Sequence, residues 1–392
     1  MRVLFWSFVG FDKHTTSEHL LIAIIEKLCE SGHYVHLLQK YTGGTLPSIP
    51  YKIQKYNITT NAINFRQVNK NNFVERYYSE LEYIQRCKKY ISSNYDAVFI
   101  QSNNVAGFAV NTIRKRMPKV LITLNVQDIF PYNLMIIEQL KKNSLVFKIL
   151  AFIQRYGYKN TDQIITISED MKDTLVEDGI KATKITVIYN WSYQDELFQE
   201  TTNIETDKMF NKNFYNVVYA GNIGRMQNVD VIIEAANVLK NNKAIMFHII
   251  GDGVYKKELE KKAEIYGLTN VMFWPMQVPD LAPVIYSAAD INVIPLKKGI
   301  YRTALPSKTA TCLACQKPII FAIGENSKFG NKIKKEAFCE IIDSNDYKKL
   351  ANVIQTIKND NQKTINTTFY MENCLLSKNS KKYVEIITQK KE

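Results

Sequence analysis

The sequence has little of what marks several classes of protein. Its 392 residues include only 15 glycines and 10 prolines, which excludes a collagen-like or low-complexity chain. No apolar run approaches the roughly 18 residues that a membrane-spanning helix needs, so we expect no such helix. The first ten residues, MRVLFWSFVG, carry one basic residue and no small-residue cleavage pattern, so we expect no signal peptide.

Cysteine is also scarce, with six scattered residues. Only Cys312 and Cys315 form a C-x-x-C motif, and no second pair stands at the spacing of a zinc site. The motif lies among apolar residues of an expected helix, which favours buried structural thiols over a metal or redox pair. We therefore expect a reduced, cytoplasmic protein without a bound metal.

The residues that are present indicate a folded, basic protein. Hydrophobic residues make up 46% and charged residues 23%, which excludes wholesale disorder and fits two or three domains. The net charge is +13, and residues 1–160 hold 21 Lys and Arg against 10 Asp and Glu. A basic surface attracts phosphates, anionic lipid or nucleic acid, and charge alone does not choose among them. A merely solubilising surface is the alternative.

Short apolar runs rich in β-formers alternate with helical periodicity, which predicts parallel sheets covered on both faces. The expected strands are residues 2–8, 34–38, 97–101, 120–125, 164–168, 185–189, 216–221, 245–251, 271–274, 291–296, 318–323 and 340–343. The expected helices are residues 15–30, 76–93, 104–116, 135–158, 169–177, 229–241, 255–266, 280–289, 307–315, 347–358 and 370–390.

The alternation pauses at residues 191–214, a polar stretch that we interpret as a linker. The class is therefore α/β, with two doubly wound Rossmann-like domains facing a central cleft. We place the first domain at residues 1–195 and the second at 196–370. A C-terminal helix at 371–392 is expected to pack back on the first domain. Ligands in such folds bind at the carboxyl ends of the strands.

Two glycine-containing turns follow strands of the second domain. Gly221, Gly224 and Arg225 offer backbone amides and a guanidinium fork, which suits a diphosphate. This is not the full G-x-G-x-x-G pattern, and no acidic residue ends the next strand, so dinucleotide binding is disfavoured. The second turn, at Gly251, serves either the chain reversal alone or contact with a ligand.

Two further segments carry candidate polar groups. Leu305-Pro306-Ser307-Lys308 precedes a helix, which makes either an anion site with an added cation or an ordinary capped helix. In the first domain, Asp128 ends a strand, where it could take a proton, bind a hydroxyl or cap the next turn. Gly10, after the first strand, would let a ligand approach the backbone or serve a plain turn.

Several motifs together resemble glycosyltransferase family 4. They are YAGNIG at 219–224, GDG at 251–253, YSAADI at 286–291, and PSK at 306–308 leading to KPII at 317–320. QDIFP at 127–131 and the PSK segment resemble the bacterial branch that builds capsule, O-antigen and exopolysaccharide units. The resemblance implies a GT-B fold, a nucleotide-sugar donor in the second domain, an acceptor in the first, and transfer with retention. It also implies no D-x-D metal site, and the sequence contains no D-x-D.

The resemblance further implies roles for particular residues. Arg225 and Lys308 would hold the donor diphosphate and act in catalysis with Asp128. The remaining donor-site residues would be Gly10, Gly221, Gly224, Gly251, Met276, Leu305, Pro306, Ser307 and Thr311. Lys13, His14 and Asp128 would contact the acceptor.

The sequence departs from the family pattern at the ribose site. Thr311 stands where the family usually has a glutamate that accepts hydrogen bonds from the ribose diol, and Thr303 stands at its partner position. A hydroxyl does not replace the paired acceptors of a carboxylate. Asn222 and Gln227 replace a common arginine and lysine, and Gln127 falls near a common histidine.

We therefore expect a metal-independent, retaining hexosyl- or N-acetylhexosaminyltransferase that uses a UDP-sugar and no cofactor. Its acceptor would be a saccharide or an undecaprenyl-diphosphate-linked saccharide at the inner face of the cell membrane, with no nucleic acid involved. The helix at 135–158, with basic and apolar residues, either lies on anionic lipid or packs in the core. The rivals are a non-catalytic glycosyltransferase-like subunit and a nucleotide-sugar 2-epimerase.

Overall fold

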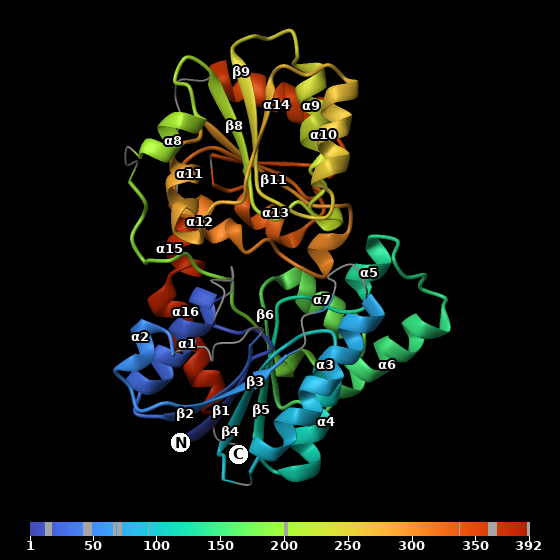
Figure 1. Ribbon diagram of the computed structural model, residues 1–392, viewed down its shortest axis with the longest axis vertical. Helices are drawn as coiled ribbons and strands as arrows, with labels where there is room; N and C mark the ends of the chain where they lie inside the picture. The colour runs from blue at the N-terminus through green and yellow to red at the C-terminus, as the bar shows by residue number, and fades with distance from the viewer. Residues whose placement is uncertain are drawn as a thin grey trace. The chain divides into compact units, whose positions relative to one another are not determined.

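The computed structural model describes residues 1–11, 18–41, 49–65, 68, 73–92, 94–199, 203–336, 338–359 and 367–389. The chain forms two compact units, shown in Figure 1. Unit 1 contains Met1–Tyr189 and Leu376–Glu392, and unit 2 contains Asn190–Leu375. The chain therefore enters unit 2 once and returns to unit 1 for its last helix.

Unit 1 is built on a parallel sheet in the order β3-β2-β1-β4-β5-β6-β7. The strands are β1 (Arg2–Trp6), β2 (Tyr34–Tyr41), β3 (Thr59–Asn64), β4 (Ala97–Gln101), β5 (Leu121–Val126), β6 (Gln163–Thr166) and β7 (Ile185–Val187). The central strands β4 and β5 are buried along their whole length, and apolar residues make up most of both. In the register, Phe5 lies opposite Phe99, and their rings stack with centroids 4.4 Å apart.

Helices cover both faces of this sheet (Figure 1). On one side lie α1 (Glu18–Glu30), α2 (Tyr51–Gln54) and α16 (Leu376–Ile387), and α16 packs against α1. On the other side lie α3 (Phe73–Cys87), α4 (Ala106–Arg116) and α6 (Leu145–Lys159). The remaining helices are α5 (Tyr132–Ile136) and α7 (Glu169–Glu177).

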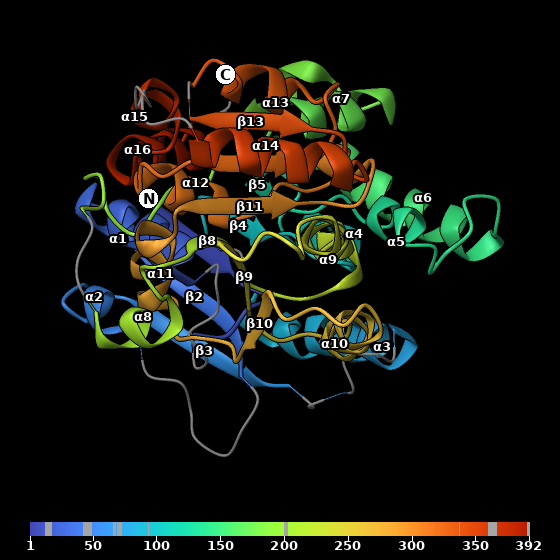
Figure 2. The same ribbon diagram turned by 90° about the horizontal axis from the view of Figure 1, so that it is seen from above.

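Unit 2 is built on a parallel sheet in the order β10-β9-β8-β11-β12-β13. The strands are β8 (Tyr215–Ala220), β9 (Ile245–Ile250), β10 (Val271–Trp274), β11 (Ile291–Pro295), β12 (Ile319–Ala322) and β13 (Cys339–Ile342). The helices are α8 (Ile204–Met209), α9 (Asp230–Val238), α10 (Lys256–Ile265), α11 (Ala282–Ala288), α12 (Lys308–Ala314), α13 (Lys328–Ile333), α14 (Tyr347–Asn359) and α15 (Thr368–Asn373). Helix α14 packs against α9 and β13 (Figure 2). Both sheets share the order of a doubly wound fold, which confirms the predicted fold class.

The predicted helix at 135–158 is wrong as a single element. The structure has α5 and α6, separated by residues 137–144. Glu138 adopts a positive φ of 62°, which ends the first helix. Ser144 starts the second, because its hydroxyl oxygen accepts a hydrogen bond from the Phe147 N–H at 3.2 Å.

The predicted linker at 191–214 is also more ordered than expected. It contains α8, whose N-cap Asn203 accepts a hydrogen bond from the Glu205 N–H at 2.8 Å. Trp191 is fully buried, and the Ser192 and Tyr370 hydroxyls lie 2.6 Å apart. The tail predicted as one helix forms two, α15 in unit 2 and α16 in unit 1.

Helices α4 and α6 pack with their backbones in direct contact. A Cβ atom on Gly157 would lie 2.5 Å from the Gly107 Cα, and one on Gly107 would lie 2.3 Å from the Ile153 carbonyl oxygen. The Gln154 side chain joins the same helices, accepting from the Gly107 N–H at 3.0 Å and donating to the Asn103 carbonyl at 2.9 Å. Only glycine permits this approach, so the two helices are locked face to face.

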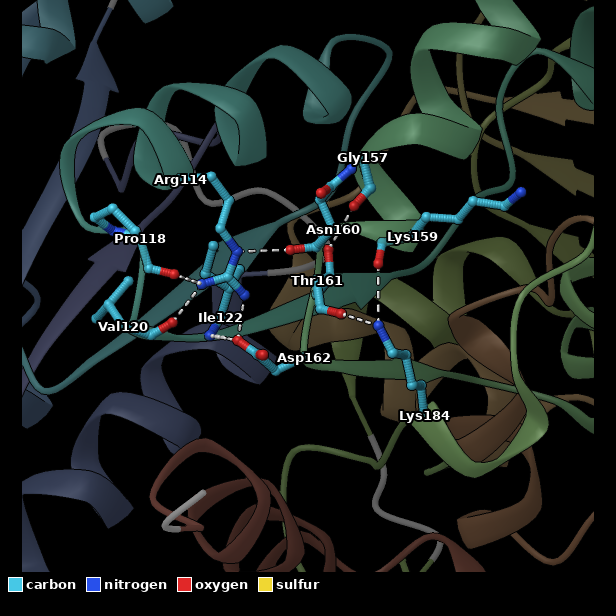
Figure 3. Close-up of polar contacts among 10 residues, drawn as sticks. All are labelled: Arg114, Pro118, Val120, Ile122, Gly157, Lys159, Asn160, Thr161, Asp162 and Lys184. Carbon is cyan, nitrogen blue, oxygen red and sulfur yellow. Dashed lines mark hydrogen bonds and ion pairs between the residues drawn. The ribbon is translucent and has the colours of Figure 1, made fainter. Parts of the chain in front are cut away.

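A polar cluster at the amino edge of the unit 1 sheet anchors the end of α6 (Figure 3). The Arg114 guanidinium donates to the carbonyls of Asn160 at 2.8 Å and Val120 at 2.6 Å, and pairs with Asp162. Lys184 donates to the Lys159 carbonyl at 3.0 Å. The contacts with Lys159 and Asn160 satisfy carbonyls that the end of the helix leaves without partners.

Candidate functional site

Two glycine turns meet at the carboxyl edge of the unit 2 sheet. Gly221 follows β8 and Gly251 follows β9, with φ values of 138° and 154°. Their N–H groups continue the ladder, donating to the carbonyls of Ile250 at 2.9 Å and Trp274 at 3.1 Å. A Cβ atom on Gly251 would lie 1.9 Å from the Gly221 carbonyl oxygen. The two turns are therefore in backbone contact, and only glycine fits there.

Lys308, the first residue of α12, reaches this pair of turns. Its ammonium donates to the Ala220 carbonyl at 2.5 Å and lies 3.9 Å from the centroid of the Tyr219 ring. A Cβ atom on Gly221 would lie 2.7 Å from the ammonium nitrogen. The structure thus brings together Lys308, Gly221 and Gly251, three residues that the sequence places far apart.

The position of Lys308 lowers the pKa of its ammonium group. Burial removes solvent that stabilises the charged form, and this lowers the pKa to about 8. The ring face of Tyr219 and the Ala220 carbonyl offset part of this cost without supplying a negative charge. An anion that reached this partly buried site would therefore pair with an ammonium group whose positive charge is poorly compensated by the protein.

Arg225 lies on the same loop system but in a more exposed position. It begins a short 3-10 helix, Arg225–Gln227, that follows Gly224. The Gly224 N–H donates to the Gln227 side-chain oxygen at 3.1 Å, which fixes the turn. The guanidinium lies over the Tyr255 ring, 5.3 Å from its centroid. Arg225 thus presents a cation to solvent near the carboxyl end of β8.

The other predicted donor residues are distributed around this edge. Leu305 is buried, Pro306 is partly buried and Ser307 is exposed, immediately before Lys308. The Ser307 side chain makes no capping hydrogen bond, so the capped-helix alternative does not explain this serine. Met276 follows β10 and is 51% exposed.

The two threonines at the glutamate positions are buried. Thr311 lies one turn after Lys308 in α12 and is 4% exposed. Thr303 is 2% exposed, and its hydroxyl donates to the Ile300 carbonyl at 3.1 Å. Neither environment supplies the exposed carboxylate that a ribose diol would meet in the family pattern.

The unit 1 candidates lie on the carboxyl side of the other sheet. Gly10 is buried in the loop after β1, where the next N–H, that of Phe11, donates to the Gln39 side chain at 3.2 Å. Asp128 follows β5 and is exposed, and the N-cap of the next helix is Pro131. Lys13 and His14 lie outside the described residues. Asp128 and Gly10 share an edge of one sheet, as the sequence predicted.

The pKa of Asp128 does not by itself identify a base. Neighbouring protein raises the pKa of its carboxyl to about 6 through loss of solvent. Its side chain nevertheless remains exposed, and solvent screening reduces such a shift. We therefore assign Asp128 no catalytic step on this ground.

Sequence reasoning missed the aromatic residues that support the turns. The Tyr286 hydroxyl donates to the Ala220 carbonyl at 3.0 Å, and the Tyr219 hydroxyl donates to the Asn222 carbonyl at 2.5 Å. Burial raises the pKa of both hydroxyls, so each keeps its proton and acts as a donor. Both tyrosines stand in the YAGNIG and YSAADI segments, where only their long-range contacts reveal the role.

Three further features concern the cysteines, the metal-ligating side chains and the length of the helices. Cys312 and Cys315 are buried free thiols, and the Cys315 thiol donates to the Pro283 carbonyl at 3.3 Å. Within the described ranges, no group of three or more His, Cys, Asp or Glu side chains could hold a metal ion. The helices of that same part of the chain are all too short or too polar to cross a membrane.

Three known proteins show what the chain is similar to. The colanic acid biosynthesis glycosyl transferase WcaI of Escherichia coli, a putative assignment by its name, is 33% identical over 178 residues, 44% of this chain and 43% of WcaI. The probable glycosyltransferase WbjE of Pseudomonas aeruginosa is 26% identical over 241 residues, 60% of this chain and 59% of WbjE. The chain spans about half the length of these curated relatives.

The solved structure of Anabaena HepE, in complex with UDP and glucose, covers 100% of both chains with a TM-score of 0.72 and 15% identity. This likeness shows the fold and confirms the predicted GT-B architecture of two Rossmann-like domains. Residues 17–191 match the model described as Glycosyltransferase Family 4, and residues 200–369 match the one described as Glycosyl transferases group 1. The chain therefore belongs to the glycosyltransferases that these two models describe, with a family 4 part followed by a group 1 part.

Proposed function

We propose that the protein transfers a sugar from a UDP-sugar, with retention of anomeric configuration and without a metal ion, in the biosynthesis of a surface polysaccharide. The observation that carries the proposal is the Lys308 ammonium held 3.9 Å from the Tyr219 ring beside two positive-φ glycines. This arrangement offers a diphosphate a partly buried cation that a close-packed pair of turns holds in place. WcaI and WbjE, by their names, are glycosyltransferases, and the former belongs to colanic acid biosynthesis.

The proposed chemistry assigns the cations to the leaving group. As the bond from sugar to diphosphate breaks, negative charge builds on the diphosphate oxygens, and Lys308 and Arg225 stabilise it. Gly221 leaves room for the Lys308 ammonium, because a Cβ atom there would lie 2.7 Å from its nitrogen. Asp128 is proposed to accept a hydrogen bond from an acceptor hydroxyl bound to unit 1. The proposed acceptor is a saccharide or a lipid-linked saccharide, and a lipid-linked acceptor would be met at the cytoplasmic membrane surface.

Calorimetry with UDP in EDTA tests the donor site. We expect wild-type protein to bind UDP without divalent metal, and Lys308→Met to bind it much more weakly. Lys240→Met is the matched control, because Lys240 is an exposed lysine in the loop between α9 and β9, at the opposite edge of the sheet. Binding that required magnesium or manganese, or equal affinities in all three proteins, would contradict the proposed site.

Transfer itself requires a product assay. Incubation with a panel of UDP-sugars and lipid-linked acceptors, followed by NMR of the product, gives the anomeric configuration of the new bond. A product with the configuration of the donor supports the proposal, and an inverted product contradicts the retaining mechanism. Full activity in EDTA is also expected, because the described residues hold no acidic metal cluster.

The buried threonines favour one second candidate, a non-catalytic glycosyltransferase-like subunit. Thr303 and Thr311 stand where the family pattern has glutamates, and both are at most 4% exposed. Such a subunit would bind UDP weakly or not at all and would transfer no sugar with any donor. Tight UDP binding together with product formation excludes it.

A further inference from the structure

Helix α6 presents a stripe of large apolar side chains to solvent. Leu145 is 73% exposed, Ile149 49%, Phe152 67% and Tyr156 46%. They recur at intervals of three and four residues, so they lie on one face of the helix. Val146, 53% exposed, lies beside Leu145. We call these five residues the α6 stripe; contiguous apolar surface of this kind marks an interaction site in a folded protein.

The stripe cannot turn inward, because the opposite face of α6 is fixed to unit 1. Phe147, Leu150, Gln154 and Gly157 are buried, and the Gly107–Gly157 backbone contact holds this face against α4. The Arg155 guanidinium pairs with the Asp178 carboxylate at 2.6 Å, and the Tyr132 hydroxyl of α5 donates to the same carboxylate at 2.5 Å. Exposure of the stripe is thus a consequence of packing, and not of a loosely held helix.

The charges that α6 and its flanking residues carry are all of one sign. Residues 139–161 contain no Asp or Glu. Lys141 and Lys142 precede the helix, and Lys148 and Lys159 lie on it; all four are exposed. Lys148 and Lys159 are eleven residues apart, three helical turns, so they form a basic row along one flank of the stripe. An apolar stripe with a basic border is the pattern of a helix that lies in the surface of an anionic bilayer.

We propose that the α6 stripe docks the protein on an anionic membrane, with its apolar side chains in the lipid and the lysines at the headgroups. A second copy of the chain fits less well, because a symmetric contact through this face would bring the basic rows together. A crossover helix runs antiparallel to its strands, so the first turn of α6 lies toward the carboxyl edge that carries Asp128. This inference deepens the proposed function and rests on it for the lipid-linked acceptor.

Vesicle co-sedimentation of the full chain tests the proposal. We expect binding to phosphatidylcholine vesicles containing about 30% phosphatidylglycerol, and much weaker binding to phosphatidylcholine alone or at high salt. Ile149→Ser/Phe152→Ser should lower the partition coefficient at least about tenfold. Lys148→Glu/Lys159→Glu should lower binding to the anionic vesicles specifically. The matched control is Val254→Ser/Ile265→Ser, which replaces two apolar side chains of unit 2 that are 56% and 70% exposed.

Three outcomes would overturn the proposal. The first is that the wild-type protein does not bind the vesicles. The second is that the stripe variant and its control bind equally. The third is that the wild-type protein binds no vesicles but forms a dimer, which only the stripe substitutions dissociate. UDP calorimetry on the same proteins separates this inference from the donor site. A stripe variant that keeps the wild-type UDP affinity but no longer binds vesicles supports docking through α6. A wild-type protein that binds vesicles but not UDP contradicts the proposed function alone.

Discussion

At the scale of single residues, the site depends on contacts that no local pattern encodes. The PSK segment and the glycine turns can be identified in the sequence. Their meeting at the Ala220 carbonyl depends on hydrogen bonds from residues that are 66 and 88 positions away along the chain. Tyr286 and Lys308 converge on one carbonyl because strand order places β11 beside β8. The sequence therefore predicted the candidates Gly221, Gly251 and Lys308, while the supporting role of the tyrosines required the fold.

The proposed UDP site at Lys308 predicts a pH dependence of UDP affinity in a defined direction. Burial lowers its pKa to about 8, and a bound diphosphate favours the protonated form. Affinity should be constant below this pKa and fall as pH rises through about 8, because binding then requires uptake of a proton. Calorimetry between about pH 7 and about pH 9 checks this, since the phosphates of UDP are almost fully ionised over that range.

Lys308→Met is the control for this titration. It should bind UDP weakly, with an affinity that no longer changes near pH 8. A pH profile of the same shape in the variant would assign the titration to another group.

Gly251→Ala should be strongly destabilising. Its φ of 154° strains any L side chain, and the new Cβ would lie 1.9 Å from the Gly221 carbonyl oxygen. We expect a loss of about 3 kcal/mol or more in the free energy of unfolding, measured by urea denaturation. Gly179→Ala is the control, because Gly179 also has a positive φ but no atom within 4 Å of the added Cβ. It should lose only about 1 kcal/mol, and equal losses would show that the close approach is not rigid.

At the scale of elements, apolar runs predicted several strands well. The buried strand β4 at Ala97–Gln101 and the half-exposed edge strand β10 at Val271–Trp274 match their predicted bounds, because apolar residues dominate both. The edge strand β3 was not predicted, since its sequence, TTNAIN, is mostly polar and only partly buried. The division between α5 and α6 was missed because Leu140 and Leu145 continue the apolar pattern across the break, where Ser144 acts as a cap.

Gly157→Ala tests the contact between α4 and α6. In an isolated helix this change is stabilising by about 0.5–1 kcal/mol, because alanine has the higher helix propensity. Here the added Cβ would lie 2.5 Å from the Gly107 Cα, so we expect a loss of about 2 kcal/mol or more. Chemical denaturation gives the sign directly, and a stabilised variant would refute the rigid contact.

At the scale of the whole molecule, the organising feature is the return of the chain to unit 1. Helix α16 packs on α1, and the buried Tyr383 hydroxyl donates to the Asn125 side chain of β5 at 3.0 Å. The Asn379 side chain donates to the Tyr189 carbonyl at 2.9 Å, where the chain leaves unit 1. The final helix thus completes the core of the unit that the first residues begin.

Tyr383→Phe should weaken unit 1 locally. It removes the buried hydrogen bond to Asn125, which we expect to cost about 1 kcal/mol in the free energy of unfolding. Hydrogen exchange should then quicken in β5 and α16 and remain unchanged in unit 2. Tyr51→Phe, at a side chain 88% exposed, is the matched control and should have no effect. Faster exchange throughout both units would contradict a local role for this contact.

The same return of the chain has a consequence for synthesis on the ribosome. Unit 2 is one continuous segment, Asn190–Leu375, and all of it has been translated before α16 is made. Unit 1 begins first but lacks the helix that covers α1 until residues 376–387 emerge. We therefore expect unit 2 to complete its fold before unit 1, in contrast to the usual order in which the N-terminal domain folds first. Until α16 emerges, the face of α1 that it covers stays open, and we expect chaperones to bind the nascent chain there.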